Sequence, residues 1–184
     1  MPKPRAAIGP PARGLTLLEL SIALVVLALM LTMSVPSMSA WLARHRLRAA
    51  AQDLASDLGE ARHEAARLAR PVHVVFRAGS DWCYAVALSA QADCHAPSQA
   101  PGRQRAGQAD AQLLKLVRAS DHPGVMLVEA APQSFDGRSG TSLGAPGFVQ
   151  MASARGERIH LRMSALGRPS LCTPDAGLPG IARC

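Results

Sequence analysis

The feature that most constrains the fold is a long apolar segment near the N-terminus. Between Leu15 and Ala43 the only charged residue is Glu19. An α-helix rises about 1.5 Å per residue, so roughly 20 predominantly apolar residues cross the hydrocarbon core of a bilayer. Residues 21–40 meet that length, and we expect residues 15–40 to form a single membrane-spanning helix. A carboxylate in such a helix is costly unless it is paired, so Glu19 is a candidate functional residue.

The basic residues before this segment indicate its orientation. The chain has 20 Lys and Arg residues and 13 Asp and Glu residues, for a formal net charge of +7. Three basic residues and no acid precede Gly14, which places the N-terminus in the cytoplasm and the bulk of the chain outside. Cleavage after Gly14 would leave a net charge of +4, a weak indication of a nucleic acid or an anionic surface as partner. The three residues are Lys3, Arg5 and Arg13.

Two other classes of N-terminal segment fit less well. A secretory signal peptide has a shorter apolar stretch, followed by a cleavage site of small residues. Here the polar break at residues 14–16 comes before the apolar stretch. A plain uncleaved anchor gives no role to Glu19.

The segment RGLTLLELSIALVVLALM, residues 13–30, carries a resemblance to a known family. It resembles the leader and N-terminal helix of type IV pilins and type II secretion pseudopilins, in which a short basic leader ends in Gly before a motif close to G-F-T-L-[IL]-E. Leu15 stands where the family usually has Phe. The matching residues are Gly14, Leu15, Thr16, Leu17, Leu18 and Glu19, and Pro36 lies at a position where the family also has proline.

The resemblance implies processing and assembly. A membrane prepilin peptidase would cut between Gly14 and Leu15, and the new amine of Leu15 would be methylated. Glycine suits the cut because it lets a protease approach the backbone closely. In the family the glutamate pairs with the terminal amine of a neighbouring subunit, which relieves the desolvation cost of both charges. A pair between Glu19 and the amine of its own chain is the alternative.

The helix is expected to continue as an amphipathic segment over residues 41–70. Its apolar residues recur at steps of three and four, which predicts one face packed on the chain's own domain. Contact of its basic residues with lipid head groups or partners is the alternative. We expect Pro36 to kink the helix and Pro71 to end it. The apolar face comprises Leu47, Ala51, Leu54, Leu58, Ala61, Ala65 and Leu68.

Residues 71–184 have the pattern of a β-rich domain. Short β-like runs separated by turn-rich pieces predict an antiparallel sheet, and residues 89–112 predict an exposed loop. The sequence therefore predicts an α+β fold, with a long N-terminal helix laid on the sheet. The runs are at 72–76, 83–88, 113–117, 125–130, 147–152 and 158–163.

The four cysteines are predicted to form disulfides, because the domain lies in an oxidising compartment. Three pairings are possible. The favoured pairs are Cys83–Cys94 and Cys172–Cys184, each closing a short loop. A zinc site is the alternative, with His95 beside Cys94, but no C-x-x-C spacing is present.

Two C-terminal stretches resemble the H-type minor pseudopilin domain, shared with FimT minor pilins (GspH/FimT). They are SFDGRSGT at 134–141 and GERIHLRMSALGRPSLC at 156–172. The resemblance implies a minor pseudopilin of the type II secretion pseudopilus, held in the inner membrane with a periplasmic domain and packed beside other pseudopilins or pilins. It implies no cofactor and no metal. The second stretch matches at Arg158, Ile159, His160, Leu161, Gly167, Arg168 and Cys172.

Some FimT proteins bind DNA through a Gly-Arg-x-Arg tail, which makes DNA uptake the alternative function. Here the second Arg of the motif is Ser170, and phosphate contacts depend on several cations acting together. The candidate DNA contacts are Arg158, Arg162 and Arg168. A polar outer face of a half-exposed strand is the favoured explanation of Arg158 and Arg162, which share a face with His160 because alternate residues of a strand point to the same side.

The sequence does not indicate an enzyme. The six histidines are scattered, and none lies in a nucleophile elbow, an H-E-x-x-H motif or a phosphate-binding loop. The GRSG stretch at 137–140 resembles a serine-nucleophile loop but is more simply a turn. We therefore predict a structural subunit rather than a catalyst.

Overall fold

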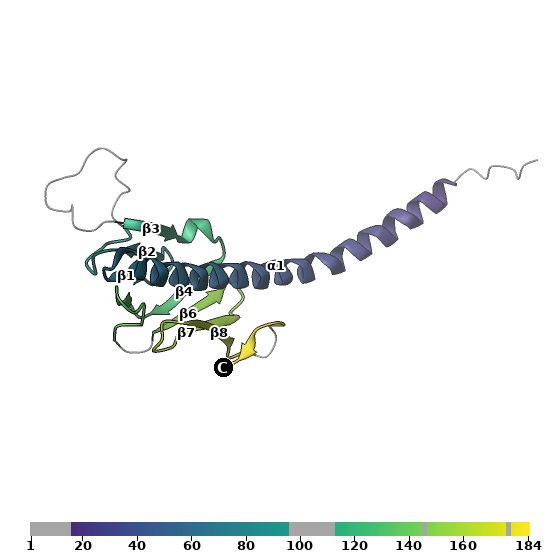
Figure 1. Ribbon diagram of the computed structural model, residues 1–184. Coiled ribbons are helices and arrows are strands. Elements are labelled where there is room, and N and C mark those ends of the chain that lie inside the picture. The colour runs from purple at the N-terminus through teal and green to yellow at the C-terminus, as the bar shows by residue number, and fades with distance from the viewer. Residues whose placement is uncertain (1–15, 96–112, 145–146, 176–177) are drawn as a thin grey trace, which may run out of the picture. The chain divides into compact units, whose positions relative to one another are not determined.

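The computed structural model describes residues 16–95, 113–144, 147–175 and 178–184, except for the side chains of residues 32–37 (Figure 1). The chain divides into two compact units, Met1–Ser39 and Ala40–Cys184. Helix α1, Leu17–Leu68, supplies the described part of the first unit and continues into the second. Gly14 and Leu15 lie outside the described residues.

The described part of the first unit is helical and largely apolar. Every residue from Thr16 to Leu31 is exposed within this single chain. Across the part of the chain with described side chains, no helix is both long enough and apolar enough to cross a membrane. The span expected at residues 15–40 includes residues 32–37, whose side chains are not described.

The second unit contains two sheets beside the C-terminal part of α1 (Figure 1). The first sheet has the order β3-β2-β1-β5 and the second has the order β4-β6-β7-β8-β9. All neighbouring strands are antiparallel except β8 and β9. The strands are β1 Val72–Arg77, β2 Cys83–Ala87, β3 Leu113–Arg118, β4 Val125–Ala130, β5 Gln133–Phe135, β6 Phe148–Ser153, β7 Arg158–Met163, β8 Pro169–Thr173 and β9 Ala182–Arg183, and a 3-10 helix spans Ala119–Asp121.

The core lies between α1 and the sheets. The predicted apolar face of the helix is buried from Leu47 to Ala65, and Leu68 is half-buried. Burial of apolar side chains at this spacing is the main stabilising contribution of an amphipathic helix. The remaining large buried side chains come from the sheets and from Trp82, which directly precedes β2: Trp82, Tyr84, Phe135, Leu127, Met151, Ile159, Leu161, Val72 and Val74.

A charged network crosses this core. Asp57 lies on the buried side of α1 with 4% of its surface exposed. The Tyr84 hydroxyl donates to Asp57 Oδ2 over 2.7 Å, and Lys115 Nζ lies 2.5 Å from Asp57 Oδ1. The network therefore ties α1 to β2 and β3. It satisfies a carboxylate that would otherwise be very costly to bury.

The helix ends at Leu68, three residues before Pro71. Ala69 has a φ of 50°, Ala69 N–H donates to Ala66 O, and Arg70 N–H donates to Ala65 O. This pair of hydrogen bonds is the Schellman motif, which usually has glycine at the left-handed position. The proline also keeps Arg70 out of the helical region, so the end comes earlier than the expected boundary.

The sheet arrangement differs from the sequence prediction. Six strands lie within about a residue of the predicted runs, but they are divided between two sheets instead of one. Strands β5, β8 and β9 were not predicted. Two of them are only two or three residues long, and β8 begins at a proline, so none has a recognisable alternating pattern.

Candidate functional site

The first candidate site is the N-terminal turn of α1. Glu19 N–H donates to Thr16 Oγ1 over 3.2 Å, and Leu20 N–H donates to Thr16 O over 3.1 Å. Thr16 is therefore the N-cap and Glu19 the third residue of the helix, the spacing of a capping box. An acid in this turn interacts favourably with the positive end of the helix dipole. Part of the Thr-Leu-Leu-Glu motif thus has a local structural role.

The surface that follows this turn is apolar on all sides. A helix that is hydrophobic all round normally lies inside a protein or a membrane. An exposed apolar surface of this size marks a site for lipid or for partner helices. The exposed large side chains include Leu17, Leu18, Leu20, Ile22, Leu24, Val25, Val26, Leu27, Leu29, Met30 and Leu31.

Pro36 lies within α1, but its side chain is outside the described set. The kink expected there stays a prediction. The cleavage and methylation expected at Gly14 and Leu15 also stay predictions, because both residues are outside the described part of the chain.

The second candidate site is the outer face of β7. Ile159, Leu161 and Met163 are buried, whereas Arg158 and Arg162 are exposed and His160 is half-buried. The three polar residues therefore share one face, as the alternation of a strand requires.

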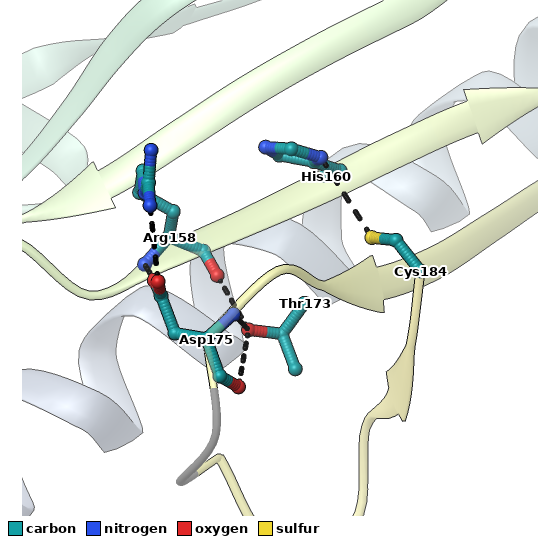
Figure 2. Close-up of polar contacts among 5 residues, drawn as sticks. All are labelled: Arg158, His160, Thr173, Asp175 and Cys184. Atoms are coloured by element: carbon teal, nitrogen blue, oxygen red, sulfur yellow. Dashed lines mark hydrogen bonds and ion pairs between the residues drawn. The ribbon is translucent and has the colours of Figure 1, made fainter.

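The charge of Arg158 is already paired on this face. Its Nη2 lies 3.1 Å from Asp175 Oδ1, and its backbone N–H donates to Asp175 Oδ2 over 2.9 Å (Figure 2). The hydrogen bond from Arg158 lowers the pKa of the Asp175 carboxyl, and the same bond raises the pKa of Arg158. Thr173 Oγ1 supports the pair by donating to Arg158 O and accepting from Asp175 N–H. Arg158 therefore already has a carboxylate partner on this face.

Arg168 lies in the turn between β7 and β8. Gly167 N–H donates to Ser164 O, and Ser164 N–H donates to Arg168 O. Gly167 has a φ of +73°, and a Cβ on it would lie 2.7 Å from Gly140 O. The glycine of the Gly-Arg pair thus meets the steric demand of a tight, closely packed turn. Arg158 and Arg162 share a strand face, while Arg168 is carried by the turn.

The SFDGRSGT stretch is a turn that packs against the end of α1. Asp136 Oδ2 accepts from the backbone N–H groups of Arg138 and Ser139 and from the Ser139 hydroxyl. The hydrogen bond from the Ser139 N–H is the main cause of the lowered pKa of Asp136. Arg62 Nε donates to Gly140 O over 3.0 Å. Ser139 thus completes an aspartate-capped turn.

The cysteines form two disulfides, Cys83–Cys94 and Cys172–Cys184, the pairing that the sequence favoured. Their Cα atoms are 5.8 Å and 4.9 Å apart. His95, considered as a zinc ligand with Cys94, instead has its Nε2 at 2.9 Å from Asp81 O.

The sequence did not predict that His160 lies beside the disulfide of Cys172 and Cys184. Its Nδ1 lies 3.7 Å from Cys184 Sγ (Figure 2). Burial, and then the charges of Arg158 and Arg162, lower the pKa of His160. The contact arises because His160 on β7 pairs in register with Cys172 on β8. No motif signals it, because the register of two strands depends on the whole sheet.

Comparison with protein-family models gave two matches. Residues 50–167 match the model described as type II transport protein GspH, which covers more than half of the chain. Residues 10–35 match the prokaryotic N-terminal methylation motif. Comparison with curated proteins and with solved structures returned no match.

Proposed function

Because the chain belongs to the GspH family of type II transport proteins, we propose that it serves as a minor pseudopilin of the type II secretion pseudopilus. The family consists of structural pseudopilins rather than enzymes. The observation that carries the proposal is the combination of the family match over residues 50–167 with an exposed apolar helix that starts at the methylation motif.

In this proposal the chain is made as a precursor. The prepilin peptidase cuts it between Gly14 and Leu15, and the Leu15 amine is methylated. The chain waits in the inner membrane with its N-terminus on the cytoplasmic side and residues 41–184 in the periplasm. Residues 15–40 then leave the lipid and pack beside the helices of other pseudopilins. Energy comes from an assembly ATPase elsewhere, and this chain supplies shape and packing.

Glu19 sets the position of the subunit in the proposed filament. After cleavage the Leu15 amine of a neighbouring subunit carries the charge that complements the Glu19 carboxylate. In a medium of low dielectric constant an unpaired carboxylate is far more costly than a paired one. A helix displaced along the filament axis would leave Glu19 unpaired, so the pair favours one axial position of the subunit relative to its neighbour.

The test of this role is Glu19→Ala in a strain that depends on the chain for secretion. We expect loss of protein export with normal cleavage of the precursor, because the change removes the assembly charge and leaves the leader intact. Glu60→Ala is the matched control, since Glu60 is an exposed glutamate of the same helix outside the N-terminal segment. Unchanged export with Glu19→Ala would show that the charge has no assembly role.

The test of processing is Gly14→Val, with Gly9→Val in the same leader as the control. We expect only Gly14→Val to leave a precursor of higher mass, because the peptidase needs a residue without a side chain at the cut. The mass of the mature N-terminus measures the outcome. Normal processing of Gly14→Val would contradict the assigned cleavage site.

DNA binding is not proposed as a second function. The ion pair with Asp175 gives Arg158, one of the three candidate DNA contacts, a role without a nucleic acid, and the tight turn gives a role to Gly167 of the Gly-Arg motif. Ser170 at the position of the second Arg donates its hydroxyl hydrogen to Arg162 O.

A further inference from the structure

Three potential metal ligands gather where β7, β8 and the C-terminal residues meet. His160 Nδ1, Cys172 Sγ and Cys184 Sγ all lie within 4.8 Å of one another. The distance from His160 Nδ1 to Cys184 Sγ is 3.7 Å (Figure 2). Ligand atoms around a tetrahedral zinc ion lie about 3.5–3.8 Å apart, given Zn–S and Zn–N bonds of about 2.3 and 2.0–2.1 Å. The distance from His160 Nδ1 to Cys184 Sγ is therefore that of two zinc ligands, and the two sulfurs, which are bonded to each other in the disulfide, can separate to the same range once that bond opens.

The surrounding backbone holds these three atoms together independently of the disulfide. His160 and Cys172 are direct cross-strand partners in β7 and β8. Cys184 N–H donates to Thr173 O over 3.1 Å, and β9 pairs with β8 just before Cys184. Thr173 is in turn fixed by its hydroxyl bond to Arg158 O. Opening the sulfur–sulfur bond therefore leaves both sulfurs beside the imidazole.

We propose that the dithiol form of Cys172 and Cys184, together with His160, is a binding site for zinc or a similar divalent cation. Two equivalents of a thiol reductant open the disulfide, giving two cysteine thiols and one disulfide of the reductant. The cation then displaces the two thiol protons, and the neutral imidazole donates the Nδ1 lone pair. Two thiolates and one imidazole leave a fourth position for water. Disulfide and metal exclude each other, so the C-terminal segment has two alternative cross-links.

The other disulfide provides an internal comparison. Cys83 and Cys94 are both buried, and the nearby His95 is turned toward Asp81. Within the described residues, His160, Cys172 and Cys184 are the one group of three potential metal-ligating side chains whose donor atoms come together. Metal binding should therefore depend on Cys172 and Cys184 and not on Cys83 and Cys94.

The experiment uses the full chain in detergent, reduced with a phosphine and titrated with Co²⁺. We expect about one Co²⁺ per chain, with an ultraviolet thiolate-to-cobalt band and visible bands of a tetrahedral site, both lost when Zn²⁺ is added. The oxidised protein should show neither band. In the reduced wild type, Zn²⁺ should also protect two thiols from alkylation, which tests the site without any substitution.

Variants assign the ligands. His160→Gln should weaken Co²⁺ binding by at least about tenfold, since loss of an outer-shell partner alone costs that much. The pair Cys172→Ser and Cys184→Ser should abolish the thiolate band, and the pair Cys83→Ser and Cys94→Ser should retain it. No thiolate band in the reduced wild type, or a band that follows Cys83 and Cys94, would overturn the proposal.

Discussion

The ionisation of Tyr84 provides a direct test of the buried charged network. The Tyr84 side chain is 2% exposed, and its hydroxyl donates to Asp57. Ionisation would place a second anion beside the Asp57 carboxylate in a buried site and would remove the hydrogen bond. The pKa of Tyr84 is therefore held far above its ordinary value of about 10. Burial of the phenol is the largest cause of this rise, and the hydrogen bond to Asp57 is the second.

The raised pKa fixes the sign of the pH dependence. A group whose pKa is higher in the folded chain adds stability that is complete below its unfolded pKa and is lost as pH rises. Above about pH 10 the unfolded chain releases the Tyr84 proton and the folded chain keeps it. The free energy of unfolding should then fall by up to about 1.4 kcal/mol per pH unit. The bond to Asp57 also raises the pKa of Lys115, which acts in the same direction but more weakly, because that side chain is 46% exposed.

The assay is ultraviolet titration of the phenolate, because Tyr84 is the only tyrosine of the chain. We expect no phenolate in the folded protein at pH 11 and a midpoint near 10 in denaturant. Asp57→Asn should lower the folded midpoint, since it removes the facing charge, whereas Asp53→Asn should change it much less, because Asp53 is exposed. A folded wild-type protein that titrates near pH 10, with its circular dichroism unchanged, would refute the assigned network.

Three further predictions concern stability in denaturant unfolding. Ala69→Gly should raise the free energy of unfolding by about 0.5–1 kcal/mol, because glycine tolerates the left-handed conformation at the helix end; a loss of stability would contradict the Schellman motif. Gly137→Ala should lower it by about 1–3 kcal/mol, since the new methyl group would collide with the Arg70 backbone, and an unchanged midpoint would argue against that packing. Replacing both Cys172 and Cys184 by serine should cost about 3 kcal/mol, as expected for a closed loop of this length, and unfolding under reducing conditions should remove the difference from wild type.

The elements that the sequence predicted well are those with local signals. The steps of three and four from Leu47 to Ala65 identify the buried face of α1, because the helical period alone determines which residues align. The run at 158–163 similarly places Arg158 and Arg162 outside and Ile159 inside. The alternation of a half-buried strand needs no knowledge of its neighbours.

The features that the sequence did not predict depend on contacts distant in the chain. Asp57 lies next to Leu58 on the buried face, and its partners Tyr84 and Lys115 are 27 and 58 residues away. The proximity of His160 to Cys184 likewise follows from strand register. The division into two sheets has the same origin, since isolated strand patterns do not specify their partners.

Asp57 also determines how the second unit would respond to axial load. Movement of α1 by one turn, about 5.4 Å, would carry the carboxylate away from Lys115 and Tyr84 and leave a buried charge without partners. The apolar residues around it, such as Leu54 and Leu58, could exchange neighbours at far smaller cost. The network therefore opposes sliding of the helix along the sheets. In a subunit pushed along its helix axis, the force would therefore reach the two sheets without displacing the helix against them.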